Sequence, residues 1–353
     1  MNIPRPRPRP LVIPSPQQNG PHHRKQVETD QQSANFGNLS PDLQPNSPPA
    51  FPVEDPARTV LKIGRYLLQK QYDGTNSYTA VNIETQLEYV CKVISVERYR
   101  DVLSAYWRID YHDNINDIVE IIVGETNAYV VFERSYGDLH SYVRDRRRLK
   151  EDEVSRLFGQ IAAAVACCHD NGIVLRDLKL RKFVFKDKEK TQLKLESLED
   201  VCVLEDENND CLVEKHGCPA YVSPEILHMN KNYSGKSADI WSLGVMLYTM
   251  LVGRYPFHDN EPSILFSKIR RGHYTIPDTL SSRAKCLIRS LLRREPTERL
   301  TGDQIAVHPW FTSRIVTRGG GATGGASSRG ERLDSDQTVP DVETNESDCF
   351  MFT

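Results

Sequence analysis

The chain has 353 residues, of which 39% are hydrophobic and 26% charged, enough for one large two-lobed domain with tails or for two ordinary domains. Its formal net charge of -3 lies in the last 40 residues, so the central body is neutral. A neutral body argues against electrostatic affinity for nucleic acid or anionic membrane, and we expect neither as a direct partner.

The first 56 residues are rich in Pro, Gln, Asn and Ser. They hold too few apolar side chains to offset the entropy lost on ordering, so residues 1–56 are expected to form a disordered, Pro-rich tail. Pro and Arg alternate over residues 4–10, which favours polyproline II and fits either a docking motif for an SH3-type partner or a solvated tail. This start also lacks the apolar run of a secretory signal.

Strand patterns follow the tail. Residues 58–94 are strand-like, and the end of this stretch alternates so that Lys92 lies on the face opposite Tyr89. Residues 127–133 form another β-rich run. These patterns predict a small β-rich N-lobe over about residues 57–135.

Helical patterns dominate the rest of the body. Residues 151–169 place apolar side chains three and four apart, as in an amphipathic helix, and Gly172 is placed to terminate it. Residues 239–252 are nearly all apolar, which is typical of a helix buried on every side, and residues 281–294 are amphipathic again. A larger helical C-lobe over about residues 136–313 completes a two-lobed fold of the α+β class.

The cysteines indicate the cellular compartment in which the protein is expected. None of the eight has the C-x-x-C spacing of a zinc or redox site, and the neighbours Cys167 and Cys168 suit a buried helix face. Scattered cysteines are typical of a reducing environment, so we expect an intracellular protein, in the nucleus, the cytoplasm or both, without a metal.

Five motifs run in order through residues 63–311, at the spacing of a protein kinase. They are Val90-Cys91-Lys92-Val93-Ile94, Leu175-Arg176-Asp177-Leu178-Lys179, Gly217-Cys218-Pro219-Ala220-Tyr221 with Ser223-Pro224-Glu225, Asp239-Ile240-Trp241-Ser242-Leu243-Gly244, and Arg299. Five matches in order make chance negligible, and the chain resembles the eukaryotic protein kinases. The resemblance implies a two-lobed protein-kinase-like fold, a buried Glu225–Arg299 pair, and a bracing role for Asp239 below the catalytic loop.

The metal-binding positions depart from the kinase pattern. Lys182 replaces the asparagine for the second metal, Ser197 replaces the first metal carboxylate, and the phosphate loop keeps only Gly74. A lysine at a magnesium position repels the ion, although rescue by Glu196 or Glu199 is an alternative. Three vestigial catalytic residues remain: Lys92, Asp177 and Lys179. We therefore expect no intact catalytic site, with ATP bound weakly at Lys92 or not at all, and no magnesium.

These departures resemble one family. Residues 133–138, 175–183 and 195–200 match the Tribbles pseudokinases nearly letter for letter. The resemblance implies a monomeric scaffold that takes CCAAT/enhancer-binding transcription factors as substrates and has mitogen-activated protein kinase kinases and the Akt kinase as further partners. It also implies a substrate-peptide region around Ser197, Leu198 and Glu199.

The second tail, residues 314–353, combines a Gly-rich linker with an acidic end and is expected to be flexible. Its Asp336-Gln337-Thr338-Val339-Pro340-Asp341 resembles the peptide by which Tribbles proteins recruit the constitutive photomorphogenic E3 ubiquitin ligase. Pro340 lowers the entropy of the free peptide, and the flanking acids Asp336 and Asp341 suit a basic rim. We predict that Asp336, Gln337, Val339, Pro340 and Asp341 bind the ligase.

One further motif has two interpretations. In the Tribbles family the stretch that contains His308-Pro309-Trp310-Phe311 is assigned to docking of a mitogen-activated protein kinase kinase. Many active kinases end in a similar segment whose aromatic side chains pack the last helix, and we favour that structural interpretation.

The predicted function is that of an adaptor. The body would hold a substrate protein and the tail would bring a ligase beside it, which raises the effective concentration of one for the other. The alternatives are a slow, metal-independent kinase and a decoy inhibitor of active kinases.

Overall fold

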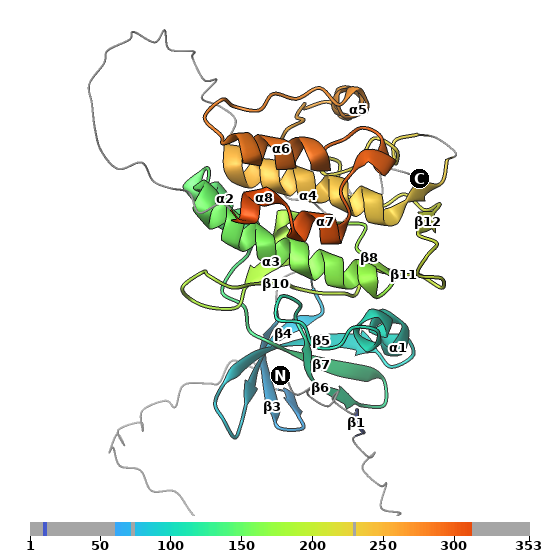
Figure 1. Ribbon diagram of the computed structural model, residues 1–353. Coiled ribbons are helices and arrows are strands. Elements are labelled where there is room, and N and C mark those ends of the chain that lie inside the picture. The colour runs from blue at the N-terminus through green and yellow to red at the C-terminus, as the bar shows by residue number, and fades with distance from the viewer. Residues whose placement is uncertain (1–9, 13–60, 72–74, 229–230, 313–353) are drawn as a thin grey trace, which may run out of the picture.

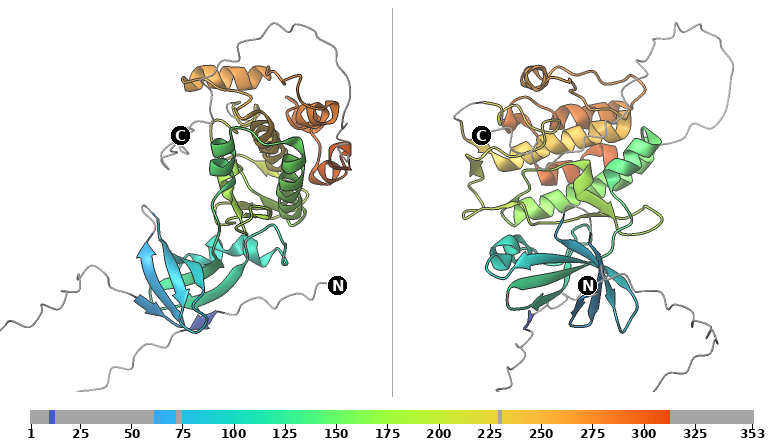
Figure 2. Two further views of the ribbon diagram at one scale, coloured as in Figure 1. Left: turned by 90° about the vertical axis from the view of Figure 1, so that its left-hand side faces the viewer. Right: turned by 180° about the vertical axis from the view of Figure 1, so that it is seen from behind.

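The chain folds into two lobes, one built on a curled β-sheet and one on packed helices (Figure 1). The computed structural model describes residues 10–12, 61–71, 75–228 and 231–312. Figure 2 shows the same division from the side and from behind. The α+β, two-lobed fold class is thereby confirmed, whereas the exact limits of the two tails stay a prediction.

The N-lobe is a seven-stranded sheet in the order β1-β6-β7-β5-β4-β3-β2. All neighbouring strands are antiparallel except β1 and β6, which are parallel. The alternation around Lys92 is confirmed, because the strand turns Cys91 into a buried cluster on the opposite face. The strands are β1 (Leu11–Val12), β2 (Leu61–Ile63), β3 (Tyr66–Gln71), β4 (Ser77–Asn82), β5 (Glu88–Ser95), β6 (Ile118–Val123) and β7 (Asn127–Glu133).

Strand β1 corrects one expectation. Leu11 and Val12 belong to the segment that was expected to be disordered, yet they lie in register with Ile122 and Val123 at the edge of the sheet. The free edge of β6 offers unpaired backbone groups, and two consecutive β-forming residues satisfy them. The rest of residues 1–56 lies outside the described residues.

The helix that follows β5 is short. Its four residues, α1 (Tyr99–Val102), are continued by a 3-10 turn, η1 (Ser104–Trp107). No side chain caps the first residue of α1, so little local stabilisation supports a longer helix. The η1 turn nevertheless buries Tyr106, which enters the space between the lobes.

The C-lobe is built around two long helices. The predicted helix over 151–169 is α3, followed by Gly172 at a positive φ of 67°. The predicted buried helix is α4, which starts at Gly235, because the Ser234 side chain accepts a hydrogen bond from the Ser237 N–H. The helices are α2 (Leu139–Arg146), α3 (Glu151–Asp170), α4 (Gly235–Val252), α5 (Pro262–Arg271), α6 (Ser282–Leu291), α7 (Gly302–Ala306) and α8 (Pro309–Thr312), with 3-10 turns η2 (Leu180–Lys182) and η3 (Pro296–Glu298).

The C-lobe also contains six short strands. They pair as β9 with β10, β8 with β11, and β12 with β13. The loop before β6 holds the lobes together, since the Asn116 N–H donates to the Leu195 carbonyl at 2.9 Å and its side chain donates to the Glu196 carbonyl at 3.1 Å. These strands are β8 (Ile173–Val174), β9 (Phe183–Phe185), β10 (Leu193–Leu195), β11 (Cys202–Val203), β12 (Cys211–Leu212) and β13 (Tyr233–Ser234).

Among the helices of the described residues, none combines the length and the apolar character needed to cross a bilayer.

Candidate functional site

The catalytic loop lies between β8 and η2, and a neighbouring carboxylate stabilises its backbone conformation. Arg176 holds a positive φ of 60°, an uncommon conformation for a residue with a side chain. The buried Asp239 carboxylate stabilises this turn by accepting from the Leu175 N–H at 2.8 Å and the Arg176 N–H at 2.9 Å. His169 contacts the same carboxylate at 2.9 Å. The bracing role implied for Asp239 is therefore present in the geometry.

Lys92 has an unexpected partner. Its Nζ lies 2.7 Å from Glu199 Oε1, and both side chains are about one-fifth exposed. Glu199 follows the positions where a kinase binds its metal, and its carboxylate is the partner of Lys92. Lys92, at the position of the phosphate-binding lysine of a kinase, is thus neutralised from the C-lobe side of the cleft.

Two further acid–lysine pairs lie in the same cleft. Lys179 Nζ is 2.7 Å from Asp177 Oδ2, and Lys182 Nζ is 3.6 Å from Asp200 Oδ2. The Asp177–Lys179 pair is well buried, whereas Asp200 is largely exposed. The space bounded by Asp177, Lys182, Ser197 and Asp200 is about 10 Å³, room for about one water molecule.

The substituted metal-binding motif is fixed by the N-lobe. The Leu198 N–H donates to the Tyr106 hydroxyl at 3.1 Å, and the Ser197 hydroxyl accepts from the Glu199 N–H at 3.2 Å. Burial raises the pKa of Tyr106, and the charge of Glu199 raises it further. Leu198 is 1% exposed, so of the three residues in the predicted peptide region only Ser197 and Glu199 are accessible, and each only in part.

These residues do not fit a magnesium ion. A kinase magnesium site needs oxygen ligands from two side chains, and here Lys182 and Ser197 stand at those positions. The neighbouring carboxylates of Asp177, Glu199 and Asp200 each face a lysine. In the part of the chain that the structure describes, no three His, Cys, Asp or Glu side chains gather as a metal site. Gly74 of the phosphate loop lies outside the described residues.

Breaking the Lys92–Glu199 pair should uncover the lysine. We expect Glu199→Gln to raise the affinity for an ATP analogue by about fivefold in the presence of EDTA, because a phosphate then no longer competes with a carboxylate. Titration with a fluorescent ATP analogue measures this change. The variant Glu199→Gln/Lys92→Ala should show no gain, and an unchanged affinity in the single variant would contradict this explanation.

The implied Glu225–Arg299 pair is present below the site. Two parallel contacts of 2.6 and 2.7 Å join the guanidinium to the carboxylate. The remaining N–H groups donate to the carbonyls of Arg293, Ser237 and Arg294, and the Trp241 ring lies 5.1 Å away. The Arg299 side chain is 1% exposed, so it is a fully satisfied buried cation that anchors η3 to α4.

Residues 308–311 belong largely to α8. Trp310 is buried and its ring, with that of Phe311, packs on Phe158 of α3. The His308 ring accepts the Trp310 N–H at 3.2 Å, and Pro309 begins the helix. The aromatic residues thus have the packing role that the sequence favoured. Docking of a kinase kinase at this segment stays a prediction.

Two contributions to this site were missed from the sequence. The sequence suggested Glu199 as a metal ligand and as part of the substrate-peptide region, although an acid next to a lost metal position is also a candidate partner for Lys92. Tyr106 carries no sequence signal for its contact with Leu198, because the contact depends on where the shortened α1 ends. The residues predicted to bind the ligase, Asp336, Gln337, Val339, Pro340 and Asp341, lie outside the described residues.

Comparison with known proteins agrees with this site. The model for the protein kinase domain matches residues 73–311. Tribbles homolog 2 of Bos taurus is 57% identical over 309 residues, 88% of this chain and 87% of its own length. Tribbles homolog 1 of Homo sapiens is 59% identical over 252 residues, 71% and 68% of the two chains, and Tribbles homolog 3 of Bos taurus is 46% identical over 346 residues, 94% of each. The chain therefore belongs to the Tribbles family of pseudokinases, with a protein kinase domain as its body.

Proposed function

We propose that this protein is a pseudokinase adaptor that brings substrate proteins to an E3 ubiquitin ligase. The observation that carries the proposal is the set of three acid–lysine pairs, Lys92–Glu199, Asp177–Lys179 and Lys182–Asp200, where a kinase would place metal and phosphate. Phosphoryl transfer relies on metal ions to neutralise developing charge, and these pairs remove the ligands for them. A folded kinase body without that chemistry suits binding better than the alternative of slow, metal-independent catalysis.

The substrate side of the proposal concerns residues 197–225, which correspond to the activation segment of a kinase. Ser197 and Glu199 lie at one end of this segment, and the half-buried Lys215 lies nearer the other. Val213 is 70% exposed beside it, an apolar side chain that a docked peptide would cover. We assign CCAAT/enhancer-binding transcription factors to this surface, with mitogen-activated protein kinase kinases and Akt as further partners, in the nucleus or the cytoplasm.

The ligase side of the proposal rests on the tail motif at residues 336–341. Calorimetric titration of the full chain with the substrate-recognition domain of the constitutive photomorphogenic ligase tests it. We expect Val339→Ala/Pro340→Ala to weaken binding by about 30-fold, because the motif loses its apolar anchor and its restricted backbone.

The matched control is Val316→Ala/Arg318→Ala, which changes two residues of the same tail outside the motif and should bind like the wild type. Equal affinity in the motif variant and the wild type would refute the assignment of the motif. An absence of binding in the wild type, repeated with the isolated tail peptide, would refute the recruitment of this ligase.

A further inference from the structure

Arginine side chains gather at the end of the C-lobe that faces away from the N-lobe. Helix α5 lies at this end of the molecule, beyond α6 (Figure 1; Figure 2). Five exposed arginines lie in the last turns of α5 and α6 or directly after α6. This arginine cluster consists of Arg270, Arg271, Arg289, Arg293 and Arg294.

Two observations show that the ends of α5 and α6 meet. The Arg294 Cβ lies 3.8 Å from the point where a side chain at Gly272, the residue after α5, would begin. Burial raises the pKa of Tyr274 to about 12, while the charges of Arg289 and Arg293 act in the opposite direction, so both guanidinium groups lie near this ring. The arginine cluster is therefore one surface and not two separate helix ends.

The buried Arg299 fixes the backbone of this surface. Its Nε donates to the Arg293 carbonyl at 2.8 Å, and its Nη2 donates to the Arg294 carbonyl at 3.2 Å. The Tyr274 ring is held by an edge contact with the Phe257 ring, at a centroid distance of 5.6 Å. A surface whose backbone is fixed before binding loses little conformational entropy when a ligand arrives.

The arginine cluster has an excess of positive charge. Among the residues that the structure describes, it forms one ion pair, of 3.9 Å between Arg293 Nη1 and Glu298 Oε2. Glu295 is a second exposed acid in the same turn. Helix dipoles favour cations in the last turns of α5 and α6, which explains the arginines inside these helices but not the two that follow α6.

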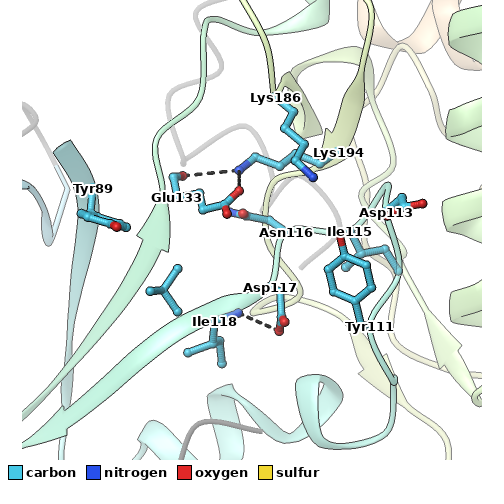
Figure 3. A pocket seen from close by; sticks show the side chains of 11 residues that line it. Tyr89, Tyr111, Asp113, Ile115, Asn116, Asp117, Ile118, Glu133, Lys186 and Lys194 are labelled. Carbon is cyan, nitrogen blue, oxygen red and sulfur yellow. Dashed lines mark hydrogen bonds and ion pairs between the residues drawn. The ribbon is translucent and has the colours of Figure 1, made fainter. Parts of the chain in front are cut away.

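The pocket behind the connection between the lobes has no such excess. Its volume is about 430 Å³, and Figure 3 shows the Lys194 amine in contact with both the carbonyl and the carboxylate of Glu133. The other charged side chains of its lining are Lys186, Asp113 and Asp117, so the acids outnumber the lysines. This pocket therefore offers no net attraction for an anion.

The composition of the arginine cluster favours a phosphate group as its ligand. All of its cations are arginines, whose planar guanidinium groups form paired hydrogen bonds with phosphate oxygens. Glu295 and Glu298 limit the extent of the positive surface. These acids would repel an extended polyanion such as duplex DNA, whereas a compact anion can avoid them.

An apolar side chain extends this surface along α5. Ile264 is 44% exposed and precedes Arg271 by two helical turns, so the two residues lie on the same face. They are about 10 Å apart along the helix axis, roughly the length of three residues of extended peptide. Lys268 lies between them and is compensated by Asp259 at 2.9 Å. The face thus offers an apolar contact and a cation at a spacing that suits a peptide.

We propose that the arginine cluster binds a phosphorylated serine or threonine of a partner protein, while an apolar side chain three residues away in that partner packs on Ile264. The interaction is reversible binding without a chemical step. It is separate from the cleft and from the tail motif, so it does not depend on the adaptor function.

Fluorescence anisotropy of the full chain with a labelled peptide tests the proposal. The probe carries one phosphothreonine and a leucine three residues away on each side. We expect Arg271→Ala/Arg294→Ala to weaken binding by about tenfold, because charge-assisted hydrogen bonds to the phosphate are lost. The matched control Arg156→Ala/Arg283→Ala removes the same charge from exposed arginines outside the cluster and should bind like the wild type.

Two further variants distinguish the parts of the surface. Arg271→Lys/Arg294→Lys keeps the charge but loses the planar guanidinium, and it should weaken binding by about threefold. Ile264→Ala should weaken binding of the leucine probe by about threefold and leave unchanged the binding of a probe with serine in place of leucine. Each variant should keep the melting temperature of the wild type, because the substituted side chains are exposed.

Three results would overturn the proposal: equal affinity for the unphosphorylated probe, equal weakening in the control at Arg156 and Arg283, or full affinity in the lysine variant. Displacement of the probe by inorganic phosphate at the concentration at which unlabelled peptide displaces it would show that the surface binds a free anion, not a protein segment. Tighter binding of a short DNA duplex through the same arginines would overturn the proposal in favour of nucleic acid.

Discussion

Asp239→Ala is expected to lower the free energy of unfolding by about 4 kcal/mol, because it leaves two backbone N–H groups and one histidine without a partner in the interior. The Asp239 carboxylate accepts from Leu175 and Arg176 and contacts His169, all within 2.9 Å. Each unsatisfied buried group costs about 1–3 kcal/mol, and the strained turn at Arg176 loses its support at the same time. Urea denaturation of the variant and the wild type measures the loss.

Asp170→Ala is the matched control for Asp239. Asp170 lies on the same helix as His169 but is exposed, at a helix C-terminus where a negative charge is unfavourable. Its removal should change the free energy of unfolding by less than about 0.5 kcal/mol. A loss below about 1 kcal/mol for Asp239→Ala would show that water or a rearranged loop replaces the carboxylate.

Arg299→Leu is expected to cost about 3–5 kcal/mol of stability, the usual effect of leaving one member of a buried ion pair alone. Glu225 is 13% exposed and would keep an uncompensated charge, while the carbonyls of Arg293, Ser237 and Arg294 would lose their donor. The measurement is again the free energy of unfolding in urea, with circular dichroism to report the loss of helix.

A double-mutant cycle distinguishes the pair from its surroundings. Glu225→Leu/Arg299→Leu should be less destabilised than the sum of the two single variants, since no charge is then left alone. The exposed arginine Arg283 on α6 gives a control, Arg283→Leu, with an expected change within about 0.5 kcal/mol. Additive losses in the cycle would contradict a direct coupling of the two charges.

Both predictions concern parts of a kinase that support its structure. The Asp239 and Arg299 networks are complete, whereas the positions that would hold metal carry Lys182 and Ser197. Substitutions at these two groups of residues should therefore have different outcomes. Substitutions in the Asp239 or Arg299 network should destabilise the folded body. Substitution of a vestigial catalytic side chain should change only the distribution of charge in the cleft.

The sequence predicted the features that local pattern determines. The three-and-four spacing over residues 151–169 produced α3, and the apolar run produced α4, because these helices bury the faces that their periodicity marks. The Glu225–Arg299 and Asp239 contacts followed from motif order, since a kinase fold brings those motifs together wherever it forms.

The sequence could not predict contacts that depend on how the lobes meet. The partners Lys92 and Glu199 are 107 residues apart, and no local rule connects them. The Tyr106 contact requires α1 to end after Val102, a boundary that weak capping leaves open. Strand β1 was missed because a two-residue strand is stabilised by the edge it covers and not by its own composition.

The three acid–lysine pairs also affect how the protein responds to its surroundings. A ligand that binds only the folded state stabilises it in proportion to the logarithm of its concentration, so an ordinary nucleotide-bound kinase is most stable when its nucleotide is abundant. Here Lys92, Lys179 and Lys182 receive their counter-charges from the chain itself. That part of the folding energy is present at any concentration of adenine nucleotide, and one of the three pairs, Lys92–Glu199, joins the N-lobe to the C-lobe whether or not nucleotide is abundant.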